Sequence, residues 1–445
     1  MEAETVAALG DHMIGWLHTY EGYDPEILRA CVHAAIRVGT PRAMAALSAY
    51  SRRRLPAEVA GMLMTGWSRF EPLSYAQQVI ANLDLQSHTV TVSSPETLQA
   101  VRTVESVRHL RIKVPVGDFR DIAHLPRLET LQAPGIVNGS VAGLGRLNSL
   151  LRLDLSSNTA IKDVTEVGQL AALEQLRLDR CASLTNLTPL RDLSRLRVLS
   201  ADRLGRVLDW EWLEGLQGLW TLSLNGYDRF DLRVLPPLSE LRSLFADFPD
   251  GVTTTSPLLR CEKLRRVRIR LRRGMDPDEL ALPPTVRSVE LHGDVTPAVI
   301  QQLAKLPRLS ALILVDVNGL TDTAPLAALT GLRELGIQET RMVDDWSELA
   351  RLTKLRKLDL SGSSVRDLDF AGEMPDLEHV VLDRCGQLLD IDGLASSTVL
   401  KSVSLRESLG GSLAASVDFL QERSANALQL QIRYIPALGD DCAVS

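Results

Sequence analysis

The chain has 445 residues, 45% of them hydrophobic and only 4% aromatic, so it can bury a large core that must be built mainly from aliphatic side chains. Its formal net charge is −7 with acidic and basic residues intermixed, which argues against general binding of nucleic acid or of an anionic membrane. No stretch approaches the roughly 18 consecutive apolar residues of a membrane span, so no transmembrane helix is expected.

Residues 1–85 are predicted to form a small helical domain. Helical periodicity of apolar residues runs through 24–37, 41–53 and 72–84, and Asp24–Pro25 suits a helix start. The N-terminus lacks the basic start and apolar core of a signal peptide. Five widely spaced cysteines without a CxxC pair argue against a disulfide framework or a zinc site, and together with the missing signal peptide they predict a cytoplasmic protein.

Residues 86–106 mark the start of a strand-rich region. The segment HTVTVSS (88–94) alternates like a β-strand, and a short helix is expected from Pro95. We expect these residues to cap the first of the repeats that follow.

Residues 107–408 form an array of about 14 repeats of 22–23 residues. Each repeat contains two apolar residues separated by one residue, and the first of the two, here called the opening residue, recurs every 21 to 23 positions without a break. The opening residues are Leu110, Leu131, Leu153, Leu176, Leu199, Leu222, Leu244, Val267, Val289, Leu312, Leu335, Leu358, Val380 and Val403. Fourteen consecutive matches to one register exclude chance.

The spacing within a repeat predicts a strand followed by a tight arc. A step of two sends both apolar residues inward and the residue between them outward. The steps of three that follow, as in LTNLTPLRDLSRL (184–196), do not match one α-helix but suit 3-10-like turns. No single unit closes a core, so the units must stack into an α/β solenoid with parallel strands on its concave face. The outward residues expected there are Asp154, Arg177, Ser200, Ser223, Phe245, Arg268, Glu290, Ile313, Gly336, Asp359 and Val381.

Small polar residues stand three places after the second apolar residue of several repeats. Asn158, Cys181 and Cys385 occupy this position. We expect each of them to satisfy backbone amides in the turn that leaves the strand.

LRLDLSSN (151–158) and LEQLRLDRC (173–181) resemble the LxxLxLxxN/C signature of leucine-rich repeats. The repeat length is similar to that of the bacterial internalin-like class, and the resemblance covers roughly Val107 to Leu405. It implies a leucine-rich-repeat horseshoe and leaves the ligand open. Two repeats depart from the pattern, one with arginines in KLRRVRIRLRR (263–273) and one with Pro134–Gly135 after its strand.

A second resemblance rests on GWSRFEPLSYAQQVIANLD (66–84). Trp67, Phe70, Tyr75, Ala76 and Val79 look like the W-x2-F-x4-Y-A-x2-V pattern near the end of the helical region of bacterial NACHT-type (STAND, NLR-like) signalling ATPases, where it directly precedes a repeat sensor. The resemblance implies a sensor that works with an attached or separate NACHT ATPase. If the ATPase is attached, Met1 marks a truncation or an alternative start. The other interpretation is that these aromatics are simply the core of a helical cap.

Residues 409–445 are predicted to form a C-terminal cap and tail. SLAASVDFLQER (412–423) has a helical pattern and ALQLQIRYI (427–435) reads as a last strand. The exposed end of a repeat array requires such a cap.

No motif for catalysis or for a cofactor is found. The chain lacks GxxxxGK[ST], HExxH and GxSxG, and GLGRLN (143–148) is a broken GxGxxG that we interpret as a turn between repeats. His379, Asp383 and Cys385 lie close in sequence, but Cys385 occupies an inward position, so no metal is expected. An effector with a ligase activity would need a nucleophilic cysteine, and Cys31 lies on an apolar helical face where we expect it to be core. We therefore predict no enzyme, no cofactor and no metal.

The most unusual stretch, 263–273, suggests where a ligand binds. Arginine projecting beside exposed aromatic side chains is typical of interaction hot spots. The candidate ligand-binding residues are Arg266, Arg268, Arg270, Phe245, Phe248 and His292. The alternative is a cross-strand ladder in which Asp247 neutralises Arg270 and Glu290 neutralises Arg268, with no partner assigned to Arg266.

These observations favour a binding module over an enzyme. The hypothesis is a cytoplasmic sensor that recognises a protein, foreign or from a phage, in bacterial antiphage defence; the defence role comes from the NACHT resemblance alone. The alternative is a stand-alone cytoplasmic scaffold or effector that binds proteins through the concave face. A secreted adhesin is disfavoured by the missing signal peptide.

Overall fold

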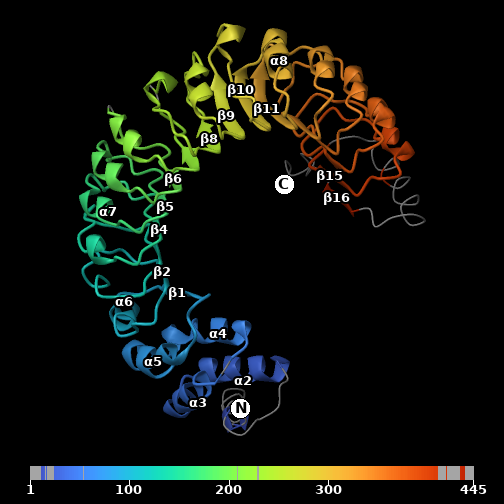
Figure 1. Cartoon of the computed structure of the whole chain (residues 1–445). Coiled ribbons are helices and arrows are strands. Elements are labelled where there is room, and N and C mark those ends of the chain that lie inside the picture. Colours follow the sequence, from blue (N-terminus) through green and yellow to red (C-terminus); the bar gives the residue numbers. More distant parts are fainter. Residues whose placement is uncertain are drawn as a thin grey trace, which may run out of the picture. The chain divides into compact units, whose positions relative to one another are not determined.

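The computed structural model describes residues 12–15, 17, 25–53, 55–207, 209–227, 230–408, 417 and 431–435. The chain divides into two compact units, residues 1–219 (unit 1) and 220–445 (unit 2). Each unit contains parallel strands on one side and short helices on the other (Figure 1).

Unit 1 begins with helices packed on one another. They are α2 (Pro25–Val38), α3 (Pro41–Ser51), α4 (Ala57–Leu63), η1 (Gly66–Arg69), α5 (Pro72–Gln78) and η2 (Ile80–Asn82), followed after the first strand by α6 (Pro95–Val101). Proline at the first position and a capping side chain start several of them: Thr40 accepts from the Ala43 amide before α3, and Ser94 and Thr97 form a capping box at α6. The predicted helices at 24–37 and 41–53 correspond to α2 and α3, the one predicted at 72–84 is divided into α5 and the 3-10 turn η2, and the sequence patterns did not predict α4.

The Trp67–Val79 stretch forms the core of these helices. Trp67, Tyr75, Ala76 and Val79 are buried, and the Tyr75 ring stacks on Phe70 with 5.0 Å between centroids. The Tyr75 hydroxyl donates a hydrogen bond to the Leu63 carbonyl at 2.7 Å, and burial raises its pKa. Packing of the helical region is therefore enough to account for these residues in this chain.

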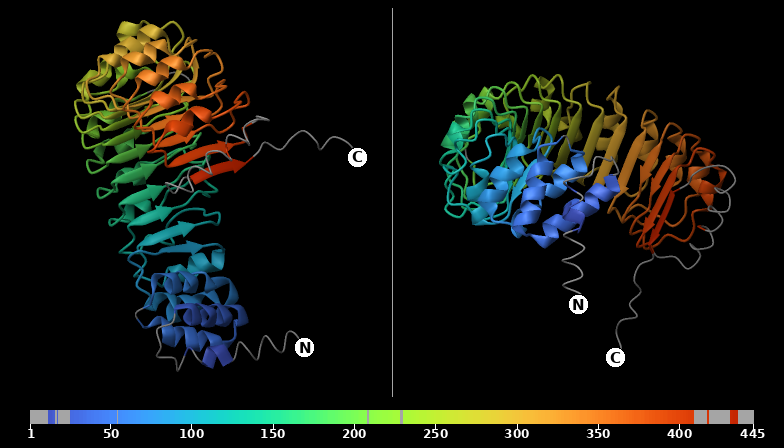
Figure 2. Two further views of the ribbon diagram at one scale, coloured as in Figure 1. Left: turned by 90° about the vertical axis from the view of Figure 1, so that its right-hand side faces the viewer. Right: turned by 90° about the horizontal axis from the view of Figure 1, so that it is seen from below.

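The strands of unit 1 pair in chain order and in parallel, as Figure 2 shows. They are β1 (Thr89–Val92), β2 (His109–Ile112), β3 (Thr130–Gln132), β4 (Arg152–Asp154), β5 (Gln175–Arg177) and β6 (Val198–Ser200). The arcs between them contain η3 (Leu144–Arg146), α7 (Thr165–Gly168) and η4 (Thr188–Asp192), with η5 (Glu211–Gly215) after β6.

The strands of unit 2 follow the same rule. They are β7 (Thr221–Ser223), β8 (Ser243–Ala246), β9 (Arg266–Leu271), β10 (Ser288–Asp294), β11 (Ala311–Asn318), β12 (Glu334–Gln338), β13 (Lys357–Asp359), β14 (His379–Val381), β15 (Ser402–Arg406) and β16 (Gln431–Ile435). Their arcs contain η6 (Leu232–Val234), η7 (Ser256–Arg260), η8 (Pro277–Glu279), α8 (Pro297–Ala304), η9 (Ala324–Ala328), η10 (Ser347–Arg351), η11 (Asp369–Glu373) and η12 (Asp392–Ser396).

The opening residues stack directly on one another. Leu110 pairs with Leu131, Leu131 with Leu153, and in unit 2 Leu312 pairs with Leu335. Every opening residue is at most 2% exposed. The predicted leucine-rich-repeat solenoid, with a small helical region before it, is confirmed.

The arcs with helical turns are mostly 3-10 helices, as predicted from the steps of three; the exceptions are α6 before β2, the four-residue α7 and α8. The segment between β10 and β11 is the α-helix α8, capped by Thr296 and started by Pro297. Its buried residues Val299, Ile300 and Leu303 are spaced one, three and four apart, which is the stripe of an α-helix and not of a 3-10 turn.

A left-handed residue recurs in or just after the strands. Among the described residues, the non-glycine residues of positive φ all stand four places after an opening residue; they are Ser157, Arg180, Arg203, Asp316, Glu339, Arg384 and Glu407. The conformation costs such a residue roughly 1–2 kcal/mol. It turns the amide toward the next repeat, so that Arg180 donates to the Asp202 carbonyl at 2.7 Å and Arg384 to that of Arg406 at 2.7 Å. The left-handed conformation thus allows neighbouring repeats to form backbone hydrogen bonds past the ends of their strands.

The small polar residues behave as expected only in part. Oδ1 of Asn158 accepts from the Ile136 amide at 2.6 Å, and its Nδ2 donates to the carbonyls of Ala133 and Leu155, both at 2.7 Å. The cysteines also donate to carbonyls, Cys181 to Leu155 at 3.3 Å and Cys385 to Leu360 at 3.1 Å. A thiol is a weak donor and a weak acceptor, and the backbone amide of Asn158 at Cys181 and those of Gly362 and Ser363 at Cys385 donate to the sulfur, which lowers the pKa of each thiol against the effect of burial.

The predicted C-terminal helix at 412–423 lies outside the described residues apart from Val417, which is buried. β16 lies within the predicted last strand and pairs in parallel with β15. Among the described residues, we find no helix with the length and hydropathy needed to span a bilayer.

A comparison of two glycines distinguishes the cost of backbone strain from the cost of a steric clash when each is replaced by alanine. Gly251 and Gly274 have φ of +70° and +71°, so alanine costs each a similar backbone strain of roughly 1–2 kcal/mol. A Cβ at Gly251 would lie 2.4 Å from the Arg272 nitrogen, whereas a Cβ at Gly274 meets nothing within 4 Å. We predict that Gly251→Ala lowers the free energy of unfolding by at least about 2 kcal/mol more than Gly274→Ala, measured by urea denaturation. Equal losses would show that the β8–β9 connection relaxes freely.

Candidate protein-binding surface

The strands around β9 are longer than those in most of the array. β9, β10 and β11 have 6, 7 and 8 residues, whereas β5 and β13 have three. Their outward positions therefore form a wider patch, here called the β8–β11 face. Its residues are Ser243, Phe245, Asp247, Arg266, Arg268, Arg270, Ser288, Glu290, His292, Ala311, Ile313 and Val315.

The alternation on β9 is as predicted. Val267, Ile269 and Leu271 are buried, and Arg266, Arg268 and Arg270 between them are exposed or half-buried. The register places Phe245 and Glu290 on either side of Arg268. The side chains that could contact a ligand are thus brought together on one face.

A charged network joins five of these side chains. Nε of Arg268 lies 2.8 Å from Oε1 of Glu290, and Nε of Arg270 lies 2.7 Å from Oδ1 of Asp247. His292 stands between the two acids, 3.1 Å from Glu290 and 3.7 Å from Asp247. The ion pairs of the predicted cross-strand ladder, Arg268–Glu290 and Arg270–Asp247, are therefore present.

The electrostatics of Glu290 follow from these contacts. Burial by itself raises its pKa, but the hydrogen bond with His292 and the guanidinium of Arg268 outweigh burial, so the pKa is lowered. The guanidinium of Arg268 also lies over the Phe245 ring at 5.3 Å, which adds a cation–π contact.

Arg266 is the exception among the arginines. Its side chain is exposed, and it makes no ion pair or side-chain hydrogen bond with any described residue. A guanidinium without an internal partner is available for a carboxylate of another molecule. Of the six candidate residues, Arg266 is thus the one most open to a ligand.

Phe248 does not belong to this face. We expected it to be exposed beside Phe245, but it is only 1% exposed and packs on Phe230 with 4.8 Å between ring centroids. The alternation of β8 continues past Ala246: Asp247 points outward and Phe248, four places after Leu244, points into the core.

Two features of β11 and β12 were not recognised in the sequence. Ile313 was predicted to point outward, but the apolar, half-buried patch that it forms with Ala311 and Val315 was missed, although the alternation in ALILVDVN (311–318) would have indicated it. Gly336, expected to be an outward residue, is buried because Ile313 lies over it; a Cβ there would meet Ile313 at 3.2 Å. The face thus combines charged and apolar patches.

Outward polar residues elsewhere bond within the chain. Asp179 accepts from the Ser200 hydroxyl and the Asp202 amide at 2.7 and 3.0 Å. Asp383 does the same with Ser404 and the Arg406 amide at 2.7 and 2.9 Å. These carboxylates join neighbouring repeats and are structural.

The other sequence candidates also have structural roles. In GLGRLN, the amides of Gly143 and Gly145 donate to Oε2 of Glu166 at 2.7 and 3.1 Å, so this turn binds a carboxylate of its own chain. Burial raises the pKa of the Cys31 thiol, which opposes formation of the nucleophilic thiolate. Nδ1 of His379 lies 2.7 Å from the Ser402 hydroxyl. Within the part of the chain that is described, no three His, Cys, Asp or Glu side chains come together as a metal site.

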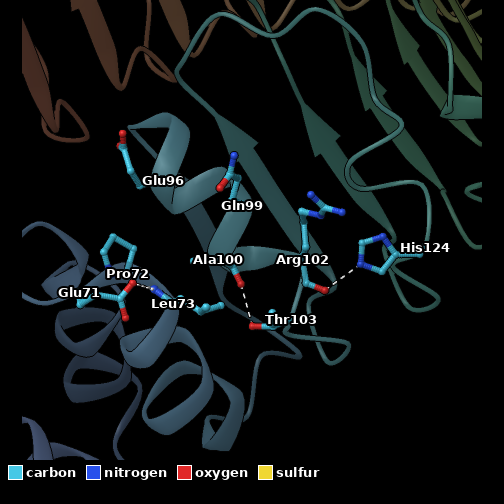
Figure 3. Close-up of a pocket in the computed structure, with 9 residues that line it drawn as sticks. All are labelled: Glu71, Pro72, Leu73, Glu96, Gln99, Ala100, Arg102, Thr103 and His124. Atoms are coloured by element: carbon cyan, nitrogen blue, oxygen red, sulfur yellow. Dashed lines mark hydrogen bonds between the residues drawn. The ribbon is translucent and has the colours of Figure 1, made fainter.

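An open hollow in unit 1 lies between α5 and α6 (Figure 3). Its polar groups are engaged locally: Glu71 accepts from the amides of Leu73 and Ser74 at 3.0 and 2.6 Å, and Thr103 donates to the Ala100 carbonyl at 2.9 Å. The ring of His124 contacts the Arg102 carbonyl at 2.8 Å. We therefore assign these groups to the helix ends and not to a ligand.

Comparison with solved structures finds bacterial leucine-rich repeat proteins. An internalin from Listeria monocytogenes is 22% identical with a TM-score of 0.48, covering 72% of this chain and 91% of that chain. Internalin C2 of the same species is 25% identical with a TM-score of 0.33, covering 46% and 80%, and a leucine-rich repeat protein of Leptospira interrogans is 17% identical with a TM-score of 0.44, covering 82% and 88%. No protein family and no curated protein matches the chain.

Glu290 should make stability depend on pH. Its carboxylate has a lowered pKa, so its contribution is present above the unfolded value of roughly 4.3 and is lost as the pH falls through the folded value. We predict that Glu290→Gln lowers the free energy of unfolding by about 1–3 kcal/mol at pH 7, and that the difference from the wild type shrinks below about pH 4.

The measurement is urea unfolding of both proteins across this pH range. Glu262→Gln, which changes an exposed carboxylate, is the matched control and should show no loss at either pH. A loss in Glu290→Gln that does not depend on pH would assign the effect to packing instead of charge.

Proposed function

We propose that the chain is a protein-recognition module and that its partner docks on the β8–β11 face. The observation that carries the proposal is the network of Arg268, Glu290, His292, Asp247 and Arg270. Beside it lie an apolar patch and Arg266, which has no side-chain partner among the described residues. Interfaces combine an apolar centre with a polar rim, and their hot spots are rich in arginine and aromatic residues.

The rigidity of this face supports binding. Arg268 and Arg270 are held by acids on neighbouring strands, so little side-chain freedom remains to be lost when a partner arrives. Arg266 supplies an available charge, and Ile313 and Val315 supply apolar area. The face is broad, which suits a protein surface better than a small molecule, whose sites are concave.

We further propose that the module is the sensor region of a cytoplasmic NLR-like protein in bacterial defence. The support is the resemblance of Trp67, Phe70, Tyr75, Ala76 and Val79 to the NACHT-associated pattern directly before a repeat array. On this proposal a NACHT ATPase, attached or separate, receives the binding event. The alternative is a stand-alone scaffold or effector that uses the same face.

The partner and the face can be tested together. The purified chain is used for affinity capture from phage-infected and uninfected lysates, with Arg266→Glu and the control Arg195→Glu beside it. Arg195 is an exposed arginine of unit 1 for which the described residues offer no ion pair. We predict a protein enriched from infected lysate only, bound at least about tenfold more weakly by Arg266→Glu and normally by Arg195→Glu.

Three outcomes would contradict parts of the proposal. Identical partners from both lysates would contradict infection sensing and favour a housekeeping scaffold. Normal binding by Arg266→Glu would move the binding site away from the β8–β11 face. An equal loss in both variants would indicate attraction by overall charge and not a defined site.

A further inference from the structure

A column of arginines runs along the amino-terminal ends of the unit 2 strands. Its members stand two places before successive opening residues, and the set, here called the rim column, is Trp220, Arg242, Arg265, Arg287, Ser310, Arg333 and Arg356. The column ends there, because the next two equivalent positions are Glu378 and Lys401, which pair with each other. The backbone places them on consecutive repeats: the Arg265 amide donates to the Arg242 carbonyl at 2.9 Å, and that of Arg287 to Arg265 at 2.8 Å. The same bonding continues through Ser310 and Arg333 to Arg356.

The charges of this column are poorly compensated. Arg242 lies over the Trp220 ring at 4.5 Å, and Arg356 reaches Glu378 only at 3.9 Å. Arg265, Arg287 and Arg333 are exposed and form no ion pair with the described part of the chain. Like charges on adjacent parallel strands repel one another, so the column is destabilising unless an anion meets it.

The repeat itself does not require arginine here. In unit 1 the equivalent positions are Arg108, Glu129, Leu151, Glu174 and Arg197, in which the charges cancel. Arg108 forms an ion pair with Glu129 on the next repeat. The basic rim is thus a particular property of residues 242–356 of unit 2.

The spacing of the column indicates the shape of its ligand. Adjacent parallel strands lie about 4.8 Å apart, so the arginines recur at that distance except at Ser310, where one position of the column carries no charge. A helix with an acid at every third or fourth residue presents one carboxylate about every 5 Å, whereas an extended strand presents one on the same side only about every 6.7 Å. Arginine forms paired hydrogen bonds with carboxylates. We propose that the rim column binds the acidic face of an α-helix of a partner protein.

Two observations favour a protein helix over nucleic acid. Trp220 is the one aromatic member of the column, whereas proteins that bind single strands stack successive bases on several rings. The net charge of −7 opposes the approach of a polyanion. Trp220, 39% exposed, adds an apolar contact at one end of the column.

This surface goes beyond the proposed β8–β11 face, because none of its residues belongs to that face. The column from Arg265 to Arg356 spans four repeat steps, about 19 Å, which corresponds to about 13 residues of helix. A probe of about 20 residues is therefore long enough to cover it.

The probe is a fluorescent helical peptide with glutamate at every third or fourth position on one face. A second peptide has the same composition with its glutamates spread around the helix. The protein variants are Arg265→Glu/Arg287→Glu/Arg333→Glu and the matched control Arg127→Glu/Arg146→Glu/Arg195→Glu. The control removes the same charge from exposed arginines of unit 1 that lack ion pairs to the described residues.

We predict that the wild type binds the striped peptide at least about tenfold more tightly than the spread peptide, in a salt-dependent way. The rim variant should lose this binding and the control variant should retain it, with thermal unfolding confirming that both fold. If the reversal variant does not fold, Arg265→Gln/Arg287→Gln/Arg333→Gln replaces it and should show the same loss.

The inference is overturned if both peptides bind equally, if the rim variant binds like the wild type, or if a single-stranded oligothymidylate of about 20 nucleotides binds more tightly than the striped peptide. These outcomes leave the β8–β11 proposal untouched, because Arg266 is intact in the rim variants. Failure of Arg266→Glu to affect partner capture would likewise not bear on the rim column.

Discussion

The inward stacking of the opening residues is the constraint on which the rest of this structure depends. Each repeat is too small to bury its own apolar side chains, so its leucine or valine must lie against the same residue of the next repeat, as Val267 does against Val289. Removing one such leucine typically costs about 2–5 kcal/mol. A slip of one residue would send every inward side chain to solvent, so the stack fixes the register of each strand.

Once the register is fixed, the surface follows from it. The residues that alternate with the stack face outward, and most of the polar ones join neighbouring repeats, as Asp179 and Asp383 do. The β8–β11 face differs because its strands are longer and its charged side chains form a network with each other instead of with the backbone. Arg266 and the apolar side chains of β11 remain accessible beside this network. A surface of this kind is rigid before a partner arrives.

The features that recur in every repeat could be predicted from the sequence, whereas the features in which one repeat differs from the others were missed. The opening residues and the pairs Arg268–Glu290 and Arg270–Asp247 follow from counting, because parallel repeats place equivalent positions side by side. Phe248 was misplaced because it was grouped with its neighbours Phe245 and Asp247, although counting by twos from the inward Leu244 makes it an inward residue. The α-helix at 297–304 was missed because the spacing of its apolar residues, one, three and four positions apart, was interpreted as part of the three-residue spacing of the neighbouring arcs. The rim column went unnoticed because it becomes visible only when the same position is compared across successive repeats, and not within a single repeat.

Thiol labelling tests the central claim, the alternation about the inward stack, most directly. The natural cysteines Cys31, Cys181, Cys261 and Cys385 are buried, and burial raises the pKa of Cys181 and Cys385 to about 11, so they react slowly. In a chain with Cys442→Ser, single cysteines are introduced as Arg266→Cys and Val267→Cys, and their labelling rates are measured under native conditions. The account predicts that the cysteine at 266 reacts at the rate of an exposed thiol and the one at 267 only after denaturation. Fast labelling at 267 with protection at 266 would contradict the register and the surfaces built on it.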